Sequence, residues 1–384
     1  MLGREPKDFD VVTDARPEEI RKLFRSARLI GRRFRLAHVR FGRDIIEVAT
    51  FRAVPRTGND EESDRQMTAE GRILRDNVFG SHQEDALRRD FTVNALYYDV
   101  LDYSVIDYVG GVEDLKQGLV RVIGDPPTRF REDPVRLLRA VRFCAKLGFR
   151  IEPLTEAQLP VLAHLLGDVP PARMFEEVLK LFHGGAALET YELLRKYDLW
   201  RYLFPLTEEA LASEDHGYPR TLVALALDNT DKRIAEGKPV TPAFLFAVLL
   251  WQPLRAAIAQ YTTQGHPRGE AMRLAMVSVL SQQTRHVAIP RRIAMWVREI
   301  WMLQSKFARR GGNQPFRFVQ SERFRAAYDF LLLRTATGEE ERELSDWWTR
   351  FQEVEDHERR TMVRQLLTAK PAGRQRQRRR RRRS

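Results

Sequence analysis

Two aspartates, Asp8 and Asp10, are separated by one residue in the stretch KDFDVVT. The stretch alternates and contains β-branched residues, which predicts a β-strand. Since residues i and i+2 of a strand point to the same face, the two carboxylates would project together. Carboxylates can hold Mg²⁺, and two such ions stabilise the attacking and leaving oxygens of a phosphoryl transfer. The alternative is a pair of exposed aspartates at a strand end, because short motifs often match by chance.

Two further acids could extend such a site. Glu47 lies in the middle of IIEVATF among apolar residues. We expect it to be partly buried, and a buried carboxylate needs a partner or a metal ion. Asp90 follows two arginines in RRDFTVNAL and could complete a metal site or bind a ribose. Arg88, Arg89 and Asn94 are suited to phosphate and hydroxyl groups, although a local ion pair within RRD is the alternative.

A basic helix is predicted over EDPVRLLRAVRFCAKLG, with Pro134 at its start. Its cations recur three or four residues apart and are expected to line one face: Arg136, Arg139, Arg142 and Lys146. Asp133 precedes Arg136 by three residues, so an acceptor and a donor fork would lie side by side. Such a pair can read the edge of a nucleobase without a template. The alternative is a solvated amphipathic helix with an ion pair between these two residues.

The elements that would position these residues change character along the chain. Up to about residue 115 the pattern is α/β, with LAHVRF and IIEVATF as a predicted hairpin and ALYYDV and VIDYV as a second strand pair. SHQE is a capping box that starts a helix carrying DALRRD. Beyond Gly110 and Gly111 the strand pattern fades, and leucine-rich helical segments continue to about residue 365. An α/β head followed by an all-α remainder is therefore expected.

Composition favours a polyanionic partner. The 384 residues suggest two or three domains, and the net charge is +12. Eight arginines lie in the C-terminal stretch GRQRQRRRRRRS. A basic chain of this kind favours nucleic acid over an anionic membrane face, and arginine pairs bidentately with phosphate. A solvated tail that only aids solubility is the alternative.

Other features exclude several classes of protein. The single cysteine, Cys144, excludes a disulfide framework and a cysteine-built zinc site. The N-terminal residues are charged and lack the apolar region of a secretory signal. The most apolar run, residues 243–251, is too short to span a bilayer and predicts a core helix. We therefore expect a cytoplasmic protein without an integral membrane segment.

Five segments in order resemble the bacterial poly(A) polymerase and CCA-adding tRNA nucleotidyltransferase family, class II members of the polymerase-β-like nucleotidyltransferases. They are LGREPKDFDVVT, IIEVATFR, LRRDFTVNALYYD, DYVGGVEDL and REDPVRLLRAVRFCAKLGF. The resemblance covers most of residues 2–185 and continues more weakly beyond. The family normally carries a Gly-Gly turn and an Arg-Asp pair before this point, whereas only Met1 and Leu2 precede Gly3 here. The resemblance therefore implies a nucleotidyltransferase head that lacks its N-terminal segment.

The resemblance also implies a domain organisation and a set of site residues. Residues 1–115 would form the head, 116–185 a helical neck, 186–368 a helical body and 369–384 a disordered arginine-rich tail. The metal-binding pair would be Asp8 and Asp10, the third active-site acid Asp90, and Glu47 a second-rank metal ligand. The nucleotide-binding residues would be Arg89, Asn94, Asp133, Arg136 and Arg139, with Asp133 and Arg136 reading the base. The RNA-binding residues would be Arg142, Lys146, Arg173, Arg378, Arg379 and Arg380.

The function implied is the addition of AMP from ATP to an RNA 3′ end, as in RNA polyadenylation and decay, with two Mg²⁺ ions. The stretch LIGRRFRLAHVR and the arginine-rich tail resemble the polyadenylating branch, and the CCA-adding branch is the close alternative. A non-catalytic RNA-binding protein is the alternative outside the enzyme class. The eight histidines show no metal-ligand spacing, which disfavours a histidine-metal phosphohydrolase. The expected partners are RNA and ATP, protein partners in RNA decay stay open, and the chain is expected to be a monomer.

Overall fold

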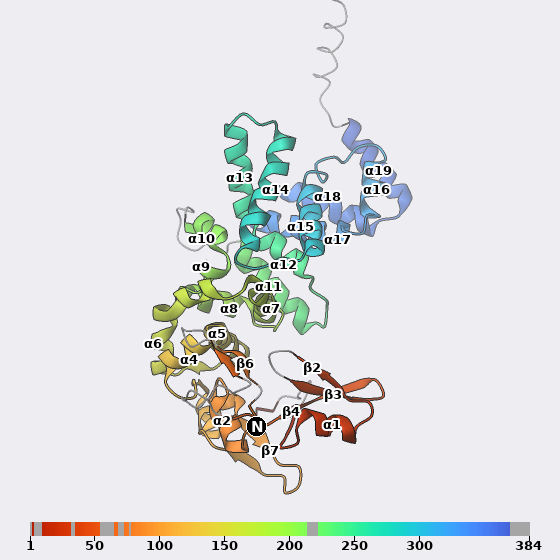
Figure 1. The fold of residues 1–384 in the computed structure, drawn as a ribbon. Coiled ribbons are helices and arrows are strands. Elements are labelled where there is room, and N and C mark those ends of the chain that lie inside the picture. Colours follow the sequence, from red (N-terminus) through yellow and green to blue (C-terminus); the bar gives the residue numbers. More distant parts are fainter. Residues whose placement is uncertain are drawn as a thin grey trace, which may run out of the picture. The chain divides into compact units, whose positions relative to one another are not determined.

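The computed structural model describes residues 2–3, 10–31, 35–53, 78–212 and 222–368, and the backbone of strands Arg65–Met67 and Ile73–Asp76 (Figure 1). The chain divides into two compact units. The N-terminal unit comprises residues 1–169 and 192–202, and the C-terminal unit comprises residues 170–191 and 203–384. Asp8, the predicted disordered tail and its Arg378, Arg379 and Arg380 lie outside the described residues.

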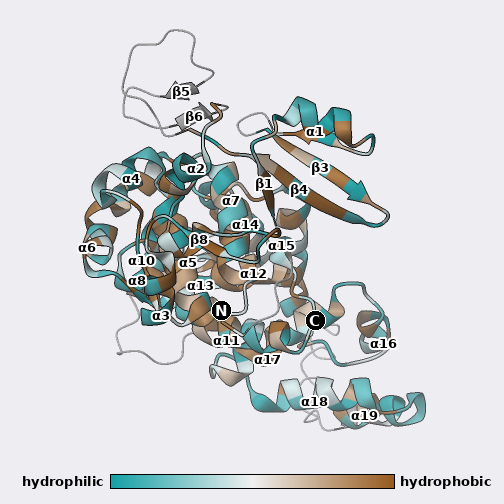
Figure 2. Cartoon of the chain, turned by 90° about the horizontal axis from the view of Figure 1, so that it is seen from below, coloured by the Kyte–Doolittle hydropathy of each residue, from teal (hydrophilic) through white to brown (hydrophobic). Residues whose placement is uncertain are grey.

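A four-stranded sheet in the order β1-β4-β3-β2 opens the N-terminal unit. Its strands are β1 Val11–Thr13, β2 Arg28–Ile30, β3 Leu36–Phe41 and β4 Asp44–Thr50. The predicted hairpin of β3 and β4 is confirmed, and β1 pairs parallel with β4. Helix α1, Pro17–Leu23, lies along one face of the sheet, where its Ile20 joins Ala37 and Val39 in an apolar cluster (Figures 1 and 2). The opposite face of the sheet is not covered by α1.

Short helices and three two-stranded pairs complete the N-terminal unit: two are antiparallel, and the pair of Leu119–Val120 with Arg150–Ile151 is parallel. The predicted capping box is confirmed, since Ser81 and Glu84 cap α2, His82–Arg88. The predicted pair of β7 Leu96–Tyr98 and β8 Val105–Asp107 is also confirmed. The predicted basic helix is α5, Val135–Leu147, which ends at Gly148 in the left-handed region. The remaining elements are η1 Thr92–Asn94, α3 Gly111–Gln117, β9 Leu119–Val120, α4 Pro126–Glu132, β10 Arg150–Ile151, α6 Pro153–Leu162 and η2 Ala163–Asp168.

In the described part of the C-terminal unit every regular element is a helix, which confirms the expected fold class. The helices are α7 Pro171–Phe182, α10 Pro205–Ala212, α11 Leu222–Ala235, α12 Pro242–Leu249, α13 Trp251–Thr263, α14 Arg268–Thr284, α15 Arg291–Gln304, α16 Gln314–Val319, α17 Phe324–Ala336, α18 Arg342–Glu353 and α19 Asp356–Thr368. Helices α8 Ala187–Lys196 and α9 Trp200–Leu203 fall across the division between the units.

The predicted apolar core helix is α12, whose side chains are almost all buried. Among the described residues no single helix is long and apolar enough to cross a membrane. Helices α12 and α13 together reach the required length and composition, but they are bent by 51° where they meet.

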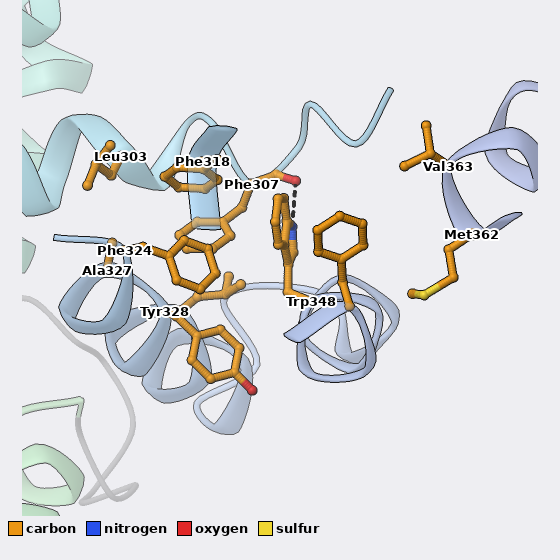
Figure 3. Packing of buried hydrophobic residues seen from close by; sticks show 11 residues of the cluster. Leu303, Phe307, Phe318, Phe324, Ala327, Tyr328, Trp348, Met362 and Val363 are labelled. Atoms are coloured by element: carbon orange, nitrogen blue, oxygen red, sulfur yellow. Dashed lines mark hydrogen bonds between the residues drawn. The ribbon is translucent and has the colours of Figure 1, made fainter. Parts of the chain in front are cut away.

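Aromatic rings form the core around α17 and α18 (Figure 3). Trp348 is fully buried and donates a hydrogen bond from Nε1 to the Phe307 carbonyl oxygen over 2.9 Å. Its ring lies perpendicular to those of Phe307 and Phe318, each with centroids 5.3 Å away. Edge-to-face pairs of this kind add to the stability from burial. This cluster fixes the segment between α15 and α17.

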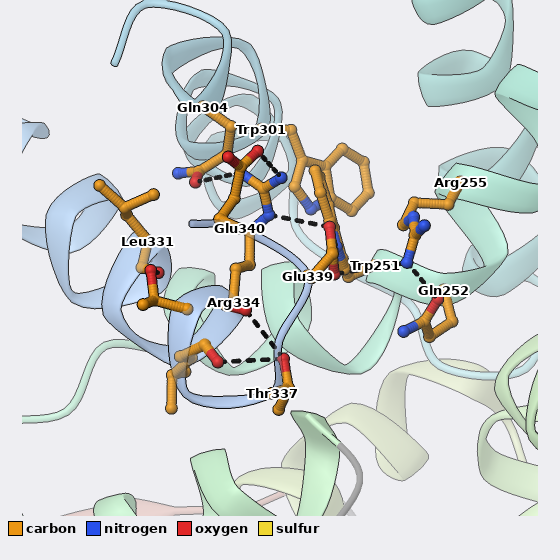
Figure 4. Close-up of polar contacts among 12 residues, drawn as sticks. Trp251, Gln252, Arg255, Trp301, Gln304, Leu331, Arg334, Thr337, Glu339 and Glu340 are labelled. Carbon is orange, nitrogen blue, oxygen red and sulfur yellow. Dashed lines mark hydrogen bonds and ion pairs between the residues drawn. The ribbon is translucent and has the colours of Figure 1, made fainter. Parts of the chain in front are cut away.

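A buried ion network ties three helices of the same unit together (Figure 4). Arg334 of α17 donates to Glu339 over 2.9 Å, to Glu340 over 2.7 Å and to Gln304 over 3.2 Å. The indole Nε1 of Trp251 donates to Glu339 as well. Since Arg334 is buried, these acceptors offset the cost of removing its charge from water. The network is structural.

Candidate active site

Asp10 lies immediately before β1 and is exposed. Val11 of β1 pairs with Val48 of β4 in a parallel register, so one residue earlier Asp10 stands beside Glu47. Val48 packs in the cluster under α1, and alternation along the strands therefore sends Asp10 and Glu47 to the opposite face. The two carboxylates share the face of the sheet that α1 leaves uncovered.

The predicted partial burial of Glu47 is wrong. Its side chain is 48% exposed, because it points to the uncovered face and the flanking apolar residues point away from it. The Glu47 carboxylate also has a protein partner, since Oε1 lies 3.0 Å from Nε2 of His38, the residue directly opposite on β3. Sequence reasoning missed His38, although the register of the predicted hairpin places His38 directly opposite Glu47.

The oxygen donors on this face fit the chemistry of Mg²⁺. Asp10 and Glu47 are exposed carboxylates at adjacent positions, and Mg²⁺ takes one or two carboxylates together with waters and substrate phosphates. Within the described ranges no group of three or more histidine, cysteine or acidic side chains could hold a metal ion. Asp8, the other half of the predicted pair, is not among the described residues, so metal binding by Asp8 and Asp10 stays a prediction.

Asp90 is held by protein donors on both carboxylate oxygens. Oδ2 accepts from Nε of Arg139 over 2.5 Å, and Oδ1 accepts from Nδ2 of Asn94 over 3.0 Å and from the Phe91 backbone N–H over 2.9 Å. The Asp90 side chain is only 11% exposed. The three predicted site residues Asp90, Asn94 and Arg139 are thus brought together. Their geometry supports a positioning role for Asp90, and its catalytic role stays a prediction.

We expect Asp90→Asn and Arg139→Met to have matching effects. Each breaks a largely buried, charge-assisted pair and should lower the free energy of unfolding by about 2 kcal/mol. Each should also lower kcat to a similar extent, since α5 loses the same anchor. Urea unfolding and steady-state kinetics of both variants test this. A loss of kcat confined to Asp90→Asn would instead assign the Asp90 carboxylate to the chemistry.

Arg89 is committed to a buried polar cluster. Its Nε donates to Asp85 over 3.2 Å and to the Tyr97 hydroxyl over 3.1 Å, and its Nη1 donates to the Asn94 carbonyl over 3.0 Å. Burial, with a smaller contribution from the Asp85 carboxylate, raises the pKa of Tyr97 above its ordinary value. The neutral Tyr97 hydroxyl then donates to Asp85 over 2.7 Å. The Arg89 guanidinium thus holds α2 against β7. The nucleotide-binding role predicted for Arg89 stays a prediction.

The cationic face expected on α5 needs a correction at Arg136, which is less exposed than the other cations. This side chain is buried and donates from Nη1 to the Arg129 carbonyl over 2.7 Å and to Glu132 over 3.0 Å. Glu132 also accepts from Arg129 over 2.6 Å. Burial and the charge of Arg136 lower the pKa of Arg129 to about 10. Arg136 is buried because α4 ends just before α5 begins, so residues of both helices enclose the first turn of α5.

This cluster links α4 to α2 as well. Nη2 of Arg129 donates to the carbonyls of Arg88 and Arg89, over 2.6 and 2.7 Å. Sequence reasoning missed Arg129 and Glu132. Glu132 lies three residues after Arg129 and four residues before Arg136, and both spacings are typical of helical ion pairs. Asp133 follows α4 as its C-cap and accepts the Arg136 backbone N–H on its carbonyl oxygen. Base reading by Asp133 and Arg136 stays a prediction.

The remaining predicted RNA contacts are distributed between the two units. Arg139 and Arg142 flank the ring of Phe143, at 5.3 and 4.4 Å from its centroid, and both are half-buried. Lys146 is exposed one turn further along α5. Arg173 is half-buried on α7, in the C-terminal unit. The structure thus keeps Arg139, Arg142 and Lys146 on one helix. Nucleotide binding by Arg139 and RNA binding by Arg142, Lys146 and Arg173 stay predictions.

Three family models match the chain. The Poly A polymerase head domain matches residues 1–121, the Probable RNA and SrmB- binding site of polymerase A matches residues 148–211, and the Polymerase A arginine-rich C-terminus matches residues 264–384. Together they extend over both units.

Curated relatives agree with these matches. The chain is 48% identical over 370 residues to Poly(A) polymerase I of Salmonella typhi, which covers 95% of this chain and 79% of that protein. It is 45% identical to Poly(A) polymerase I of Haemophilus influenzae, over 97% of this chain and 83% of that protein. The chain is 32% identical to the CCA-adding enzyme of Bacillus pumilus, over only 58% of this chain and 53% of that protein.

Solved structures share the fold. A tRNA-processing enzyme in an apo form aligns with a TM-score of 0.60 at 22% identity, over 95% of this chain and 92% of that chain. A tRNA nucleotidyltransferase complexed with a primer tRNA and an incoming ATP analog aligns with a TM-score of 0.58 at 23% identity, over 92% and 91% of the two chains. At this identity the likeness concerns the arrangement of the elements alone.

Proposed function

This chain belongs to the poly(A) polymerase family, and we propose from that premise that it extends RNA 3′ ends with AMP taken from ATP. The observation that carries this function is the 48% identity to a Poly(A) polymerase I along 95% of the chain. Exposed carboxylates on the uncovered face of the head sheet supply groups that nucleotidyl transfer needs. The CCA-adding alternative is supported more weakly, since the similarity to such an enzyme reaches only 58% of the chain.

In the proposed reaction the RNA 3′-hydroxyl oxygen forms a bond to the α-phosphorus of ATP. The bond between that phosphorus and the bridging oxygen breaks, and pyrophosphate leaves. When bound, Mg²⁺ would neutralise phosphate charge and favour loss of the hydroxyl proton. Asp10 and Glu47, with Asp8, would hold two such ions, and the sheet fixes the positions of Asp10 and Glu47 relative to each other. This proposal names the residues that would hold the metal ions implied by the family.

The protein around the sheet would bind and orient the two substrates. Adenine selection is proposed for Asp133 and Arg136, with the Glu132 and Arg129 contacts keeping the first turn of α5 in place. RNA would be held by Arg142, Lys146 and Arg173, and by the C-terminal arginines. We further propose that the head, neck, body and tail follow the boundaries expected from the sequence, and that the enzyme acts as a monomer in the cytoplasm.

Incorporation assays with single nucleotides test the proposed function. The full-length natural protein is incubated with Mg²⁺, a short RNA primer and either ATP or CTP. We expect long homopolymeric extension with ATP and little with CTP. Addition of two cytidylates and one adenylate to a tRNA lacking its 3′ end, without longer products, would assign the chain to the CCA-adding branch. Absence of incorporation with every nucleotide would support a non-catalytic RNA-binding protein.

Deletion of residues 374–384 should weaken RNA binding through charge. The segment carries eight arginines, and each phosphate contact to a single strand contributes about 0.7 to the slope of log K against log salt. The deletion is therefore expected to lower the affinity at low salt and to flatten that slope. Fluorescence anisotropy across a salt series measures both. Replacing the same arginines by lysine is the control that keeps the charge, and an unchanged slope after deletion would show that these residues do not contact phosphate.

A further inference from the structure

A cationic pocket opens on the C-terminal unit between α15 and α17. Its volume is 240 Å³, and it is lined by Lys306, Arg309, Gln314, Arg317, Phe318 and Ser321. Lys306 and Arg309 belong to the turn after α15, Gln314, Arg317 and Phe318 to α16, and Ser321 to the turn that follows. A segment of sixteen residues thus folds back on itself and brings three positive charges to one hollow.

The lining contains no carboxylate to balance these charges. Among the described residues, Lys306, Arg309 and Arg317 form no ion pair, and all three are exposed. Neighbouring cations differ: Arg310 pairs with Glu343 over 3.0 Å, and Arg323 pairs with Glu299 over 3.5 Å. The three unpaired cations are therefore placed to receive an anion from solution.

The pocket rests on a rigid floor. Phe318 is 7% exposed and packs edge-on against Phe307, Phe324 and Trp348 in the aromatic cluster of Figure 3. Lys306 Nζ stands 5.9 Å from the Phe318 ring centroid, within reach of a cation–π interaction. Because Phe318 is held in the buried cluster, the backbone of α16 that carries Arg317 is fixed before a ligand binds.

We infer that this pocket binds a backbone phosphate of the RNA primer. The inference rests on the proposed function in one respect, namely that the polyanion is the RNA being extended. Two arginines and one lysine converging without a carboxylate are suited to a phosphate group. A pocket of 240 Å³ is smaller than the roughly 300–1,000 Å³ of sites that enclose a whole small ligand. It therefore favours one phosphate group of an extended strand over an intact nucleoside triphosphate.

The test compares two variants with equal changes of net charge. In the pocket variant Lys306, Arg309 and Arg317 are replaced by glutamine. In the control variant Arg285, Arg291 and Arg298 are replaced by glutamine; these are exposed cations of the same unit that do not line the pocket. For a 20-nucleotide RNA we expect the pocket variant to bind about tenfold more weakly, with a salt slope shallower by at least about 0.7. The control should retain most of the affinity, and the KM for ATP should stay unchanged in both.

Position-specific neutralisation of the RNA distinguishes a local site from general attraction. Single methylphosphonate linkages are moved along the RNA, each removing one negative charge. The natural protein should lose affinity at one or two positions, and the pocket variant should be insensitive at those same positions. Equal losses in the pocket and control variants, or a rise in the KM for ATP instead of for RNA, would overturn the inference. At saturating primer the pocket variant should still elongate RNA, because the pocket affects only RNA binding. Absence of elongation by the natural protein would count against the proposed function and not against the pocket.

Discussion

Replacing Asp10 by asparagine is expected to reduce AMP incorporation by about a thousandfold while leaving RNA affinity unchanged. The exchange keeps the size of the side chain and removes one negative charge from the uncovered face of the head sheet. Asp10 is exposed and contributes no described ion pair, so the fold should not depend on it. Single-turnover incorporation from a saturating RNA complex measures the chemical step, and anisotropy measures RNA binding separately.

The matched control for this prediction is Asp44→Asn. Asp44 is likewise exposed and begins β4, three residues before Glu47. It should retain full activity, because alternation along β4 places Asp44 and Glu47, three residues apart, on opposite faces of the sheet. Glu47→Gln should lower incorporation if Glu47 shares the metal site, whereas a role confined to the His38 contact predicts little change. Normal incorporation by Asp10→Asn would refute the metal-site assignment.

Replacing Trp348 by alanine is expected to destabilise the C-terminal unit by about 3–5 kcal/mol. The ring is fully buried, and its removal leaves a cavity bordered by Phe307 and Phe318. The Phe307 carbonyl also loses the hydrogen bond from Nε1. Urea unfolding followed by circular dichroism reports the loss, since this unit contributes most of the helices.

Trp348→Phe is the milder comparison, because it retains an aromatic ring at this position. Phenylalanine keeps an aromatic ring in the cluster but removes the indole donor and part of the ring volume, so the expected cost is about 1–3 kcal/mol. If Trp348→Ala cost no more than Trp348→Phe, the cavity would contribute nothing and the aromatic cluster would not be the core of this region. A cost below about 1 kcal/mol for both variants would contradict the role assigned to Trp348.

Local patterns in the sequence were sufficient for the elements that carry the site. Alternation of β3 and β4, the capping box of α2 and the glycine after α5 each depend on residues close in the chain. The resemblance of the ordered motifs to one family was also contained in the sequence. These features could be predicted because backbone propensity, capping and spacing act over a few residues.

The environment of each charge was decided only by the tertiary structure. Asp90 meets Arg139 across a separation of 49 residues, and Arg129 reaches the carbonyl of Arg88 across 41. Helical spacing alone placed Arg136 on one face of α5 with the other cations, whereas the adjoining α4 encloses it. Glu47, expected to be partly buried, faces solvent because α1 covers the other side of the sheet. The cost of burying a charge depends on which partners and how much water surround it, and distant segments supply both only when the chain is folded.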